Sequence, residues 1–172
     1  MIKSFFAVAI ILLYTTVFAD IQPDDDYEFP SISETMIIQE PLTSRVLSKA
    51  QEFLGTQYKF GNKGDKKTDC SGFTQQVFGE FGITLPRSAS EQSRYGKKID
   101  IKDLKVGDLL FYRTYKKAPS HVAIYAGDGK IIHASYKGKK VQYDKIDKQY
   151  YKQRFLYAKR IVPKYEDFQQ RR

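Results

Sequence analysis

Few side chains in this sequence can supply thiol or imidazole chemistry, because its 172 residues include one cysteine, Cys70, and two histidines, His121 and His133. Cys70 stands where a helix is expected to begin, and the unpaired N–H groups and the dipole of a helix start favour a negative charge. We therefore expect this thiol to lose its proton below the free pKa of about 8.5. The same N–H groups can hold the oxyanion that forms when a thiolate attacks a carbonyl. The alternative, a small buried core thiol, fits less well with the polar neighbours Asp69 and Ser71.

A thiolate nucleophile needs a base, and the base needs a group that orients it. His121 opens one predicted strand and His133 lies on the next. We expect His121 to take the Cys70 proton and later to protonate the leaving amine. His133 then holds the His121 ring in the useful tautomer, the role that a carboxylate or an amide has in other triads. For His133 the alternative is a hydrogen-bonded histidine at a strand edge, with a structural role alone.

The hairpin between the two histidines decides whether they can meet. A turn centred on residue 127 places His121 and His133 directly opposite each other on one face of the sheet, with Cβ atoms about 4.5–5.5 Å apart. A two-residue turn at residues 128–129 instead pairs His133 with Ile124 and places the two imidazoles on opposite faces. The sequence leaves both registers open, and the catalytic interpretation requires the first.

The elements that position these residues follow from the spacing of apolar residues. Steps of three and four residues predict one helix over residues 43–54 and a second that starts at Cys70 and stops at Gly82, with Asp69, or Thr68 one residue earlier, as its N-cap. A shorter helix is expected at residues 88–95. The rest of the chain has short segments rich in β-formers between turn residues: 109–113, 121–126, 130–135, 141–146 and 155–162. Helices followed by strands predict an α+β fold, with the helices packed on a mostly antiparallel sheet of about five strands.

Composition divides the chain into four parts. Residues 1–19 have a positive start, an apolar run of about 15 residues, shorter than a membrane span, and a cleavage pattern that predicts a signal peptide cut before Asp20. We therefore expect an exported protein, periplasmic or secreted, with no stable membrane span after cleavage; an uncleaved anchor is the alternative. The other parts are an acidic arm or linker at residues 20–40, a catalytic domain at 41–163 and a C-terminal tail at 164–172.

The net charge of the chain limits the classes of binding partner that we expect. A formal net charge of +9 favours anionic partners such as peptidoglycan, acidic lipid or nucleic acid. We expect no nucleic-acid role, because the basic clusters at residues 137–140 and 171–172 come without the aromatic-basic motif of a known binding fold. Zinc bound by the cysteine, the two histidines and a water is an alternative, but the spacing lacks the paired ligands of structural zinc sites. We expect a monomer with no cofactor and no metal.

Five segments carry a further pattern, in order along the chain: 68–73 (TDCSGF), 82–92 (GITLPRSASEQ), 104–111 (LKVGDLLF), 120–125 (SHVAIY) and 131–135 (IIHAS). Together they resemble the NlpC-type cell-wall peptidases, over about residues 43–162. These are papain-like cysteine enzymes that hydrolyse peptidoglycan stem peptides, often between D-γ-glutamyl and a diamino acid. The resemblance implies the same fold and the same substrate class, peptidoglycan peptides, for this chain.

The resemblance also implies roles for individual residues. It carries over a catalytic triad of Cys70, His121 and His133, and a substrate pocket lined by Tyr58, Asp69, Ser71 and Ser120. The family's matching Tyr, Asp and Ser recognise the free amino end of the stem peptide.

The sequence departs from the family pattern at two places. Residues 60–62 (FGN) stand where the family often has Trp-Gly-Gly, and Val106 replaces a proline. Because of the first departure, the resemblance does not determine the shape of the pocket wall, and so it does not determine the substrate. Arg87 has two possible roles, binding a substrate carboxylate or bracing a loop.

Other chemistry remains compatible with the same three residues. A thiolate with a histidine base attacks any activated carbonyl, so an amidase, an acyltransferase or a thioesterase would use the same arrangement. A wall-binding protein with a blocked site is the alternative from a different class.

Overall fold

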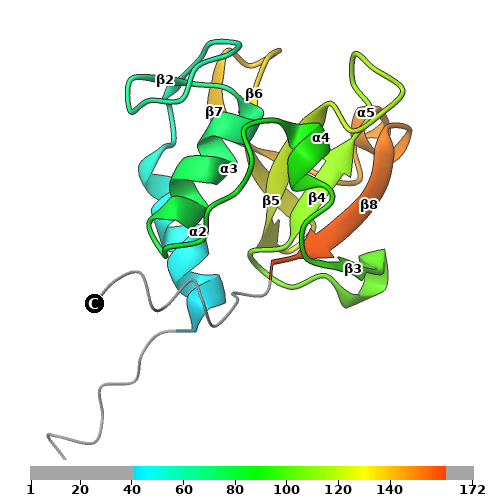
Figure 1. Ribbon diagram of the computed structural model, residues 1–172. Helices are drawn as coiled ribbons and strands as arrows, with labels where there is room; N and C mark the ends of the chain where they lie inside the picture. The colour runs from blue at the N-terminus through cyan, green and yellow to red at the C-terminus, as the bar shows by residue number, and fades with distance from the viewer. Residues whose placement is uncertain (1–40, 162–172) are drawn as a thin grey trace, which may run out of the picture. The chain divides into compact units, whose positions relative to one another are not determined.

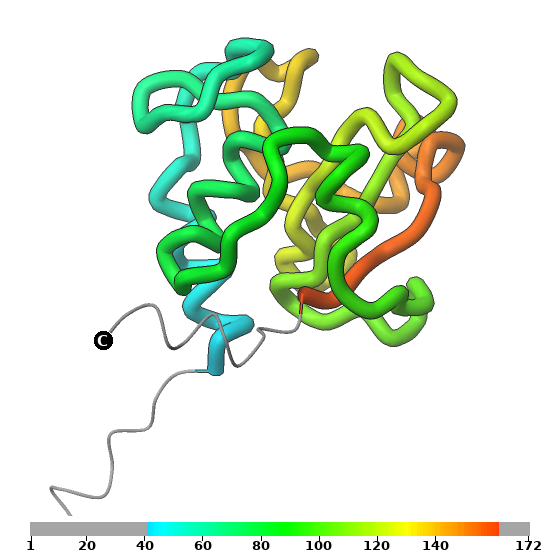
Figure 2. The backbone as a smooth tube through the Cα atoms, in the orientation of Figure 1, coloured from blue at the N-terminus to red at the C-terminus, as the bar shows by residue number. Residues whose placement is uncertain are grey.

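The computed structural model describes residues 41–161, in which helices come first along the chain and most strands follow (Figures 1 and 2). The helices are α2 (Leu42–Glu52), α3 (Cys70–Gly79), and the short α4 (Ala89–Gln92), α5 (Gln149–Lys152) and 3₁₀ turn η1 (Ile101–Asp103). This arrangement confirms the α+β fold class. The predicted signal peptide, acidic arm and C-terminal tail lie outside the described residues. Within residues 41–161, no helix has the length and apolar character needed to cross a membrane.

Helix α3 begins at Cys70 because Asp69 caps it. The Asp69 Oδ1 atom accepts a hydrogen bond from the N–H of Gly72 at 2.7 Å, which satisfies one of the free donors of the first turn. The helix ends at Gly79, three residues before the predicted stop. Gly82 follows in the left-handed region with φ +74°, so it closes the turn after the helix.

Two helices pack together on one face of the sheet. Helix α2 buries Val46 and Ala50 and contacts α3, and the rings of Phe53 and Phe73 meet edge to face with centroids 5.7 Å apart. Helix α3 in turn packs on β5 and β6. Burial of each large apolar side chain contributes about 1.5–3 kcal/mol, so this layer holds the start of α3 firmly against the sheet.

Helix α4 is shorter than the helix predicted over residues 88–95. Ser88 and Glu91 form a capping box at its start, and the helix stops at Gln92. Gly96 then adopts φ +75°, where a Cβ atom would lie 2.3 Å from the carbonyl oxygen of Arg160. The chain therefore leaves the helical path to pair with the C-terminal strand.

The sheet has eight strands within the described residues, in the order β2-β1-β7-β6-β5-β4-β8-β3. The five predicted strands are present as β4 (Leu109–Tyr112), β5 (His121–Gly127), β6 (Lys130–Ser135), β7 (Lys140–Lys145) and β8 (Phe155–Arg160). The count of about five is corrected by β1 (Gln57–Tyr58), β2 (Lys67–Thr68) and β3 (Lys97–Ile99), which are too short to show alternation in the sequence. All strand pairs are antiparallel except β1 with β2.

The β5–β6 hairpin combines features of both expected registers. Its turn is the two-residue one: Gly127 pairs with Lys130, and residues 128–129 have φ +50° and +66°. An irregularity before Gly127 then shifts the register, so that Ile124 faces Ile132. The predicted direct opposition of the two histidines is therefore wrong. Continued along β5, the register places His133 opposite residue 123, and because side chains alternate, His121 lies on the same face two residues away.

A second apolar cluster covers the other face of the sheet. It contains the buried Leu110, Tyr112, Ala123, Ile131, Tyr151 and Ala158. Tyr112 pairs across the sheet with His121, and Tyr151 comes from α5. Figure 2 shows the segment around β1 and β2 beside the β6–β7 turn, consistent with the pairing of Gln57 with Lys140. His121 and His133 thus lie between the buried core and the end of the sheet at which several loops meet.

Candidate active site

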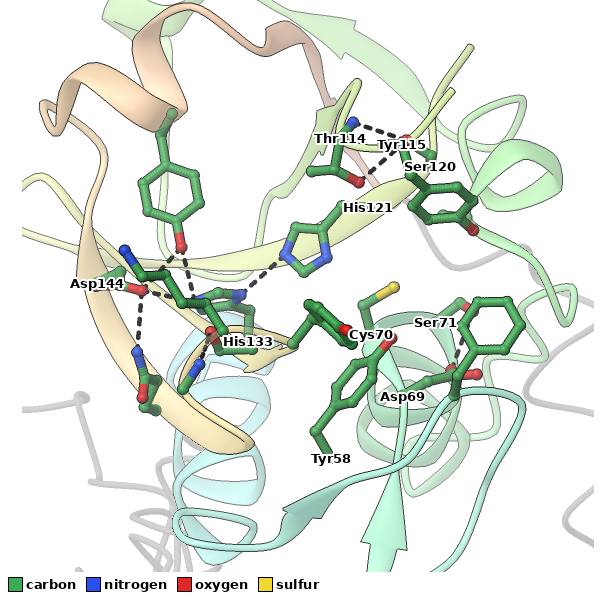
Figure 3. A pocket seen from close by; sticks show the side chains of 18 of the residues that line it. Tyr58, Asp69, Cys70, Ser71, Thr114, Tyr115, Ser120, His121, His133 and Asp144 are labelled. Carbon is green, nitrogen blue, oxygen red and sulfur yellow. Dashed lines mark hydrogen bonds and ion pairs between the residues drawn. The ribbon is translucent and has the colours of Figure 1, made fainter. Parts of the chain in front are cut away.

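Cys70 lines a cleft at the start of α3 (Figure 3). The cleft encloses about 1340 Å³, and it is lined by every residue that the sequence assigned to the site: Tyr58, Asp69, Cys70, Ser71, Ser120, His121 and His133. These residues come from β1, from the first turn of α3, from the beginning of β5 and from β6. Cys70 is 9 % exposed, so it is sheltered and still borders the cleft.

The two histidines form a line that leads away from Cys70. His121 Nε2 lies 2.8 Å from His133 Nδ1, and the rings meet edge to face with centroids 5.0 Å apart. Figure 3 shows the other ring nitrogen of His121, Nδ1, on the side of Cys70. This geometry leaves Nδ1 available for the thiol proton while Nε2 is held by His133. The structure therefore brings together the three residues expected to form a triad.

Burial controls the protonation of this site. It raises the pKa of the Cys70 thiol to about 11, and backbone N–H groups of Val122 and of the first turn of α3 act in the opposite direction with less effect. Burial, reinforced by His133, lowers the pKa of His121 well below 6.5. The lowered thiol pKa expected from the helix start is therefore wrong for the resting site. Both shifts disfavour a charged thiolate–imidazolium pair in the resting site.

The carboxylate of Asp69 is hydrogen-bonded to other residues of the protein. Its Oδ1 accepts from the N–H of Gly72 and its Oδ2 from the N–H of Gly61, at 2.7 and 2.8 Å. Arg87 donates to both oxygens, from Nη1 at 3.0 Å and from Nη2 at 2.6 Å. Of the two roles open for Arg87, the structure gives it the bracing one, because its guanidinium ties the loop before α4 to the start of α3. A substrate ammonium at Asp69 would share a carboxylate that already has four partners.

The two serines assigned to the pocket make hydrogen bonds within its walls. Ser71 Oγ donates to Asp69 at 3.3 Å and accepts from Arg87 at 3.0 Å. Ser120 Oγ accepts from the backbone N–H groups of Thr114 and Tyr115 at 2.8 and 3.3 Å. Ser120 thereby folds the β4–β5 loop back toward the cleft (Figure 3).

Tyr58 differs from these serines, because its hydroxyl makes no hydrogen bond with residues 41–161. Burial raises the pKa of this phenol, so it stays protonated at neutral pH. A protonated hydroxyl beside Cys70 is a donor available to a substrate oxygen.

Sequence reasoning missed the group at the far end of the histidine line. Asp144 Oδ2 lies 3.0 Å from His133 Nε2 and also accepts from Tyr151 and Gln142, at 2.8 and 3.1 Å, while Oδ1 pairs with Lys148. The ladder pairs His133 with Gln142 and residue 131 with Asp144. The predicted strand over residues 141–146 contained the signal, because alternate residues of a strand share a face.

Exposed aromatic rings form part of the rim of the cleft. Phe60 and Tyr115 are 70 % and 62 % exposed, and their rings meet edge to face with centroids 6.2 Å apart. Phe60 belongs to the segment that departs from the family pattern, and Tyr115 to the β4–β5 loop. On another part of the rim, the ring of Tyr136 contacts the Nζ atom of Lys139, 3.9 Å from the ring centroid, and Lys137 lines the cleft beside it. The cleft therefore offers both apolar surface and positive charge.

Within residues 41–161, no three His, Cys, Asp or Glu side chains gather in an arrangement that could hold a metal ion.

Comparison with known proteins gives one consistent family. Residues 55–160 match the model of the NlpC/P60 family. A probable endopeptidase NlpC homolog of Haemophilus influenzae is 39 % identical over 112 residues, which cover 64 % of this chain and 58 % of the relative. The murein DD-endopeptidase MepS/murein LD-carboxypeptidase of Escherichia coli is 34 % identical over 130 residues, which cover 75 % of this chain and 68 % of the relative.

Solved structures agree with the sequence comparisons. A crystal structure of an NlpC/P60 family protein from Bacillus cereus superposes with a TM-score of 0.68 at 33 % identity, and covers 72 % of this chain and 41 % of that one. The chain thus spans 58 % of the Haemophilus relative and less than half of the Bacillus protein.

Proposed function

Because this chain belongs to the NlpC/P60 family, we propose that it is a cysteine endopeptidase that hydrolyses the stem peptides of peptidoglycan. One observation carries the proposal: Cys70, His121 and His133 follow one another from the start of α3 across the wall of a large cleft. The relatives support the same substrate class, because their names describe endopeptidases and, for the Escherichia coli protein, action on murein.

In the proposed reaction Cys70 is the nucleophile and His121 the base. His121 Nδ1 takes the thiol proton as the sulfur bonds to the scissile carbonyl carbon. The oxyanion collapses, the C–N bond breaks, and His121 returns the proton to the leaving amine nitrogen. Water then attacks the thioester while His121 takes a proton from it, and the acid product leaves as the thiol re-forms. His133 holds the His121 ring throughout.

We assign the walls of the cleft to substrate binding. The backbone N–H groups at the start of α3 and the Tyr58 hydroxyl are positioned to donate to the oxyanion. Asp69, Ser71 and Ser120 shape the pocket for the amino end of the stem peptide, the first two through their contacts with Arg87. The net charge of +9 favours the acidic wall polymer. We infer an exported monomer that acts in the periplasm or outside the cell.

Two bonds are candidates for cleavage. The bond between D-γ-glutamyl and a diamino acid follows from the resemblance of the motifs. The bond of a peptide crosslink is the second candidate, because the relative of 34 % identity is named as a DD-endopeptidase. The two reactions give different products, so one digestion distinguishes them.

The test is digestion of purified peptidoglycan, of crosslinked dimers and of free tri- and tetrapeptide stems, with products identified by mass spectrometry. Cys70→Ala and His121→Ala serve as matched inactive variants. Fragments split after D-γ-glutamyl, absent with both variants, support the first bond; conversion of dimers to monomers supports the second. A folded wild-type protein that cuts none of these substrates would overturn the proposal in favour of amidase, acyltransferase or thioesterase chemistry, or of a blocked wall-binding site.

A further inference from the structure

The line of side chains from Cys70 does not end at His133. Asp144 lies behind it with a side chain 9 % exposed, and its Oδ2 atom is 3.0 Å from His133 Nε2 (Figure 3). Tyr151 donates to the same oxygen at 2.8 Å, and Lys148 pairs with the other oxygen. This carboxylate is held by several donors, which is typical of a group whose position is fixed.

The hydrogen-bond roles along the line follow from the carboxylate. Burial opposes ionisation of Asp144, but its hydrogen bonds, that of His133 first, lower its pKa, so the group is a carboxylate at neutral pH. A carboxylate can only accept, so His133 Nε2 must carry a proton and donate it. In a neutral imidazole the other nitrogen then accepts, so His133 Nδ1 receives the hydrogen bond across the 2.8 Å contact with His121 Nε2. The base nitrogen of His121 is therefore left unprotonated on the side of Cys70.

We propose that Asp144 is a positioning residue that fixes the tautomers of both histidines and so directs the unprotonated His121 Nδ1 atom toward Cys70. The inference rests on the proposed function, because it gives Asp144 a part in that reaction. Asp144 is in hydrogen-bond contact with His133 and not with Cys70 or His121, although its side chain also lines the far wall of the cleft. It acts through His133, and its charge also stabilises the imidazolium that forms when His121 takes the thiol proton.

Removal of Asp144 would leave Tyr151 beside His133. The Tyr151 hydroxyl lies 3.2 Å from His133 Nε2, and without the carboxylate it can donate a hydrogen bond to that nitrogen. His133 would then carry its proton on Nδ1 and donate to His121 Nε2, which would force the His121 proton onto Nδ1. A histidine in that state cannot take a proton from Cys70. One substitution at a distance would thus reduce the fraction of His121 that is in the state able to act as the base.

The first test reads the tautomers directly. The chain has two histidines, so a nitrogen-15 imidazole spectrum contains two rings. In wild type both rings should show protonated Nε2 and unprotonated Nδ1. Asp144→Ala should move protons to Nδ1, and Asp144→Asn, which keeps an acceptor oxygen, should retain more of the wild-type state. Asp147→Asn removes an exposed carboxylate three residues away and is the matched control, with an unchanged spectrum. A wild-type spectrum with protonated Nδ1 on His121, or an unchanged one in Asp144→Ala, overturns the proposal.

The second test reads the reaction. Asp144→Ala should lower kcat about 10- to 100-fold with little change in KM, the loss typical when a partner that orients a histidine is removed. In Asp144→Asn the lost charge should move the acid limb of the kcat/KM profile to lower pH, because the carboxylate raises the pKa of His121. The other ionisable groups facing these residues, Cys70, Tyr112, Tyr151 and Lys148, are the same in all variants. Wild-type kcat and an unmoved pH profile in both variants would overturn the proposal.

The two proposals fail in different ways. If wild-type protein cuts no peptidoglycan peptide, the proposed function fails, but the tautomers of His121 and His133 can still be read and compared in the Asp144 variants. If wild-type protein cuts and the Asp144 variants match it in tautomer and rate, the function stands and the role of Asp144 is rejected.

Discussion

Arg87 donates hydrogen bonds to both carboxylate oxygens of Asp69, the residue that precedes Cys70. Its Nη1 atom lies 3.0 Å from Oδ1 and its Nη2 atom 2.6 Å from Oδ2. The Asp69 side chain is 7 % exposed, whereas that of Arg87 is 41 % exposed. The pair therefore joins a buried carboxylate to a surface cation. Through it, the loop that leads into α4 is tied to the residue that caps α3.

We expect loss of this cation to weaken the fold and the site together. Arg87→Met leaves Asp69 with the backbone N–H groups of Gly61 and Gly72 and the Ser71 hydroxyl as donors, and should lower the free energy of unfolding by about 2 kcal/mol in a urea titration. Arg87→Lys keeps a charge but loses the two-pronged contact, so it should fall between Met and wild type. If Arg87→Met unfolds at the wild-type urea concentration, the pair contributes nothing to stability.

A close approach of the backbone explains the glycine two residues after Cys70. A Cβ atom on Gly72 would lie 2.5 Å from the backbone oxygen of Asn62, a residue whose carbonyl also accepts from the Asp69 N–H. Gly72→Ala should therefore push the β1–β2 loop away and lower the free energy of unfolding by about 1–3 kcal/mol. Gly79→Ala is the matched control, because nothing lies within 4 Å of its Cβ position in the same helix. There alanine should stabilise by about 0.5–1 kcal/mol. Equal unfolding midpoints for the two variants would contradict this reading.

Local sequence signals predicted the start of α3 correctly. The cap, the helix and the position of Cys70 all depend on residues 69–73, so the pattern of one segment was enough. The five longer strands were predicted for the same reason. The strands β1, β2 and β3 were not, because a strand of two or three residues is stabilised by pairing with distant segments and leaves no periodic pattern of its own.

Interactions between residues distant in the sequence account for the other features that the sequence did not predict. The register between His121 and His133 depends on an irregularity before Gly127 that no turn rule indicates. The thiol pKa depends on how deeply the fold buries Cys70, and burial outweighs the helix start. The predicted strand places Asp144 on one face with residue 142, but that this is also the face of His133 depends on the strand pairing.

The protonation state of Cys70 can be tested with an alkylating reagent. Because burial raises the thiol pKa to about 11 and lowers that of His121, the resting pair is uncharged at neutral pH. The thiolate fraction, and with it the rate of alkylation by iodoacetamide, should rise about tenfold per pH unit between pH 6 and 9. A thiolate–imidazolium pair would instead give a rate that stays level across this range. Cys70 is the one cysteine of the chain, so mass spectrometry of the intact protein counts its modification directly.

For the two buried tyrosines beside the histidines, Tyr112 and Tyr151, we expect substitution by phenylalanine to have opposite effects on the free energy of unfolding. The Tyr112 hydroxyl is buried with no hydrogen-bond partner in the described part of the chain, whereas the Tyr151 hydroxyl donates to Asp144 at 2.8 Å. Tyr112→Phe removes an unsatisfied polar group and should raise the free energy of unfolding by about 1 kcal/mol. Tyr151→Phe removes a hydrogen bond to a carboxylate and should lower it by about 1.5–3 kcal/mol. Both changes remove one oxygen from a buried ring, so urea titrations of the pair compare the two environments. A loss of stability in Tyr112→Phe as large as in Tyr151→Phe would mean that the Tyr112 hydroxyl has a partner, such as a bound water.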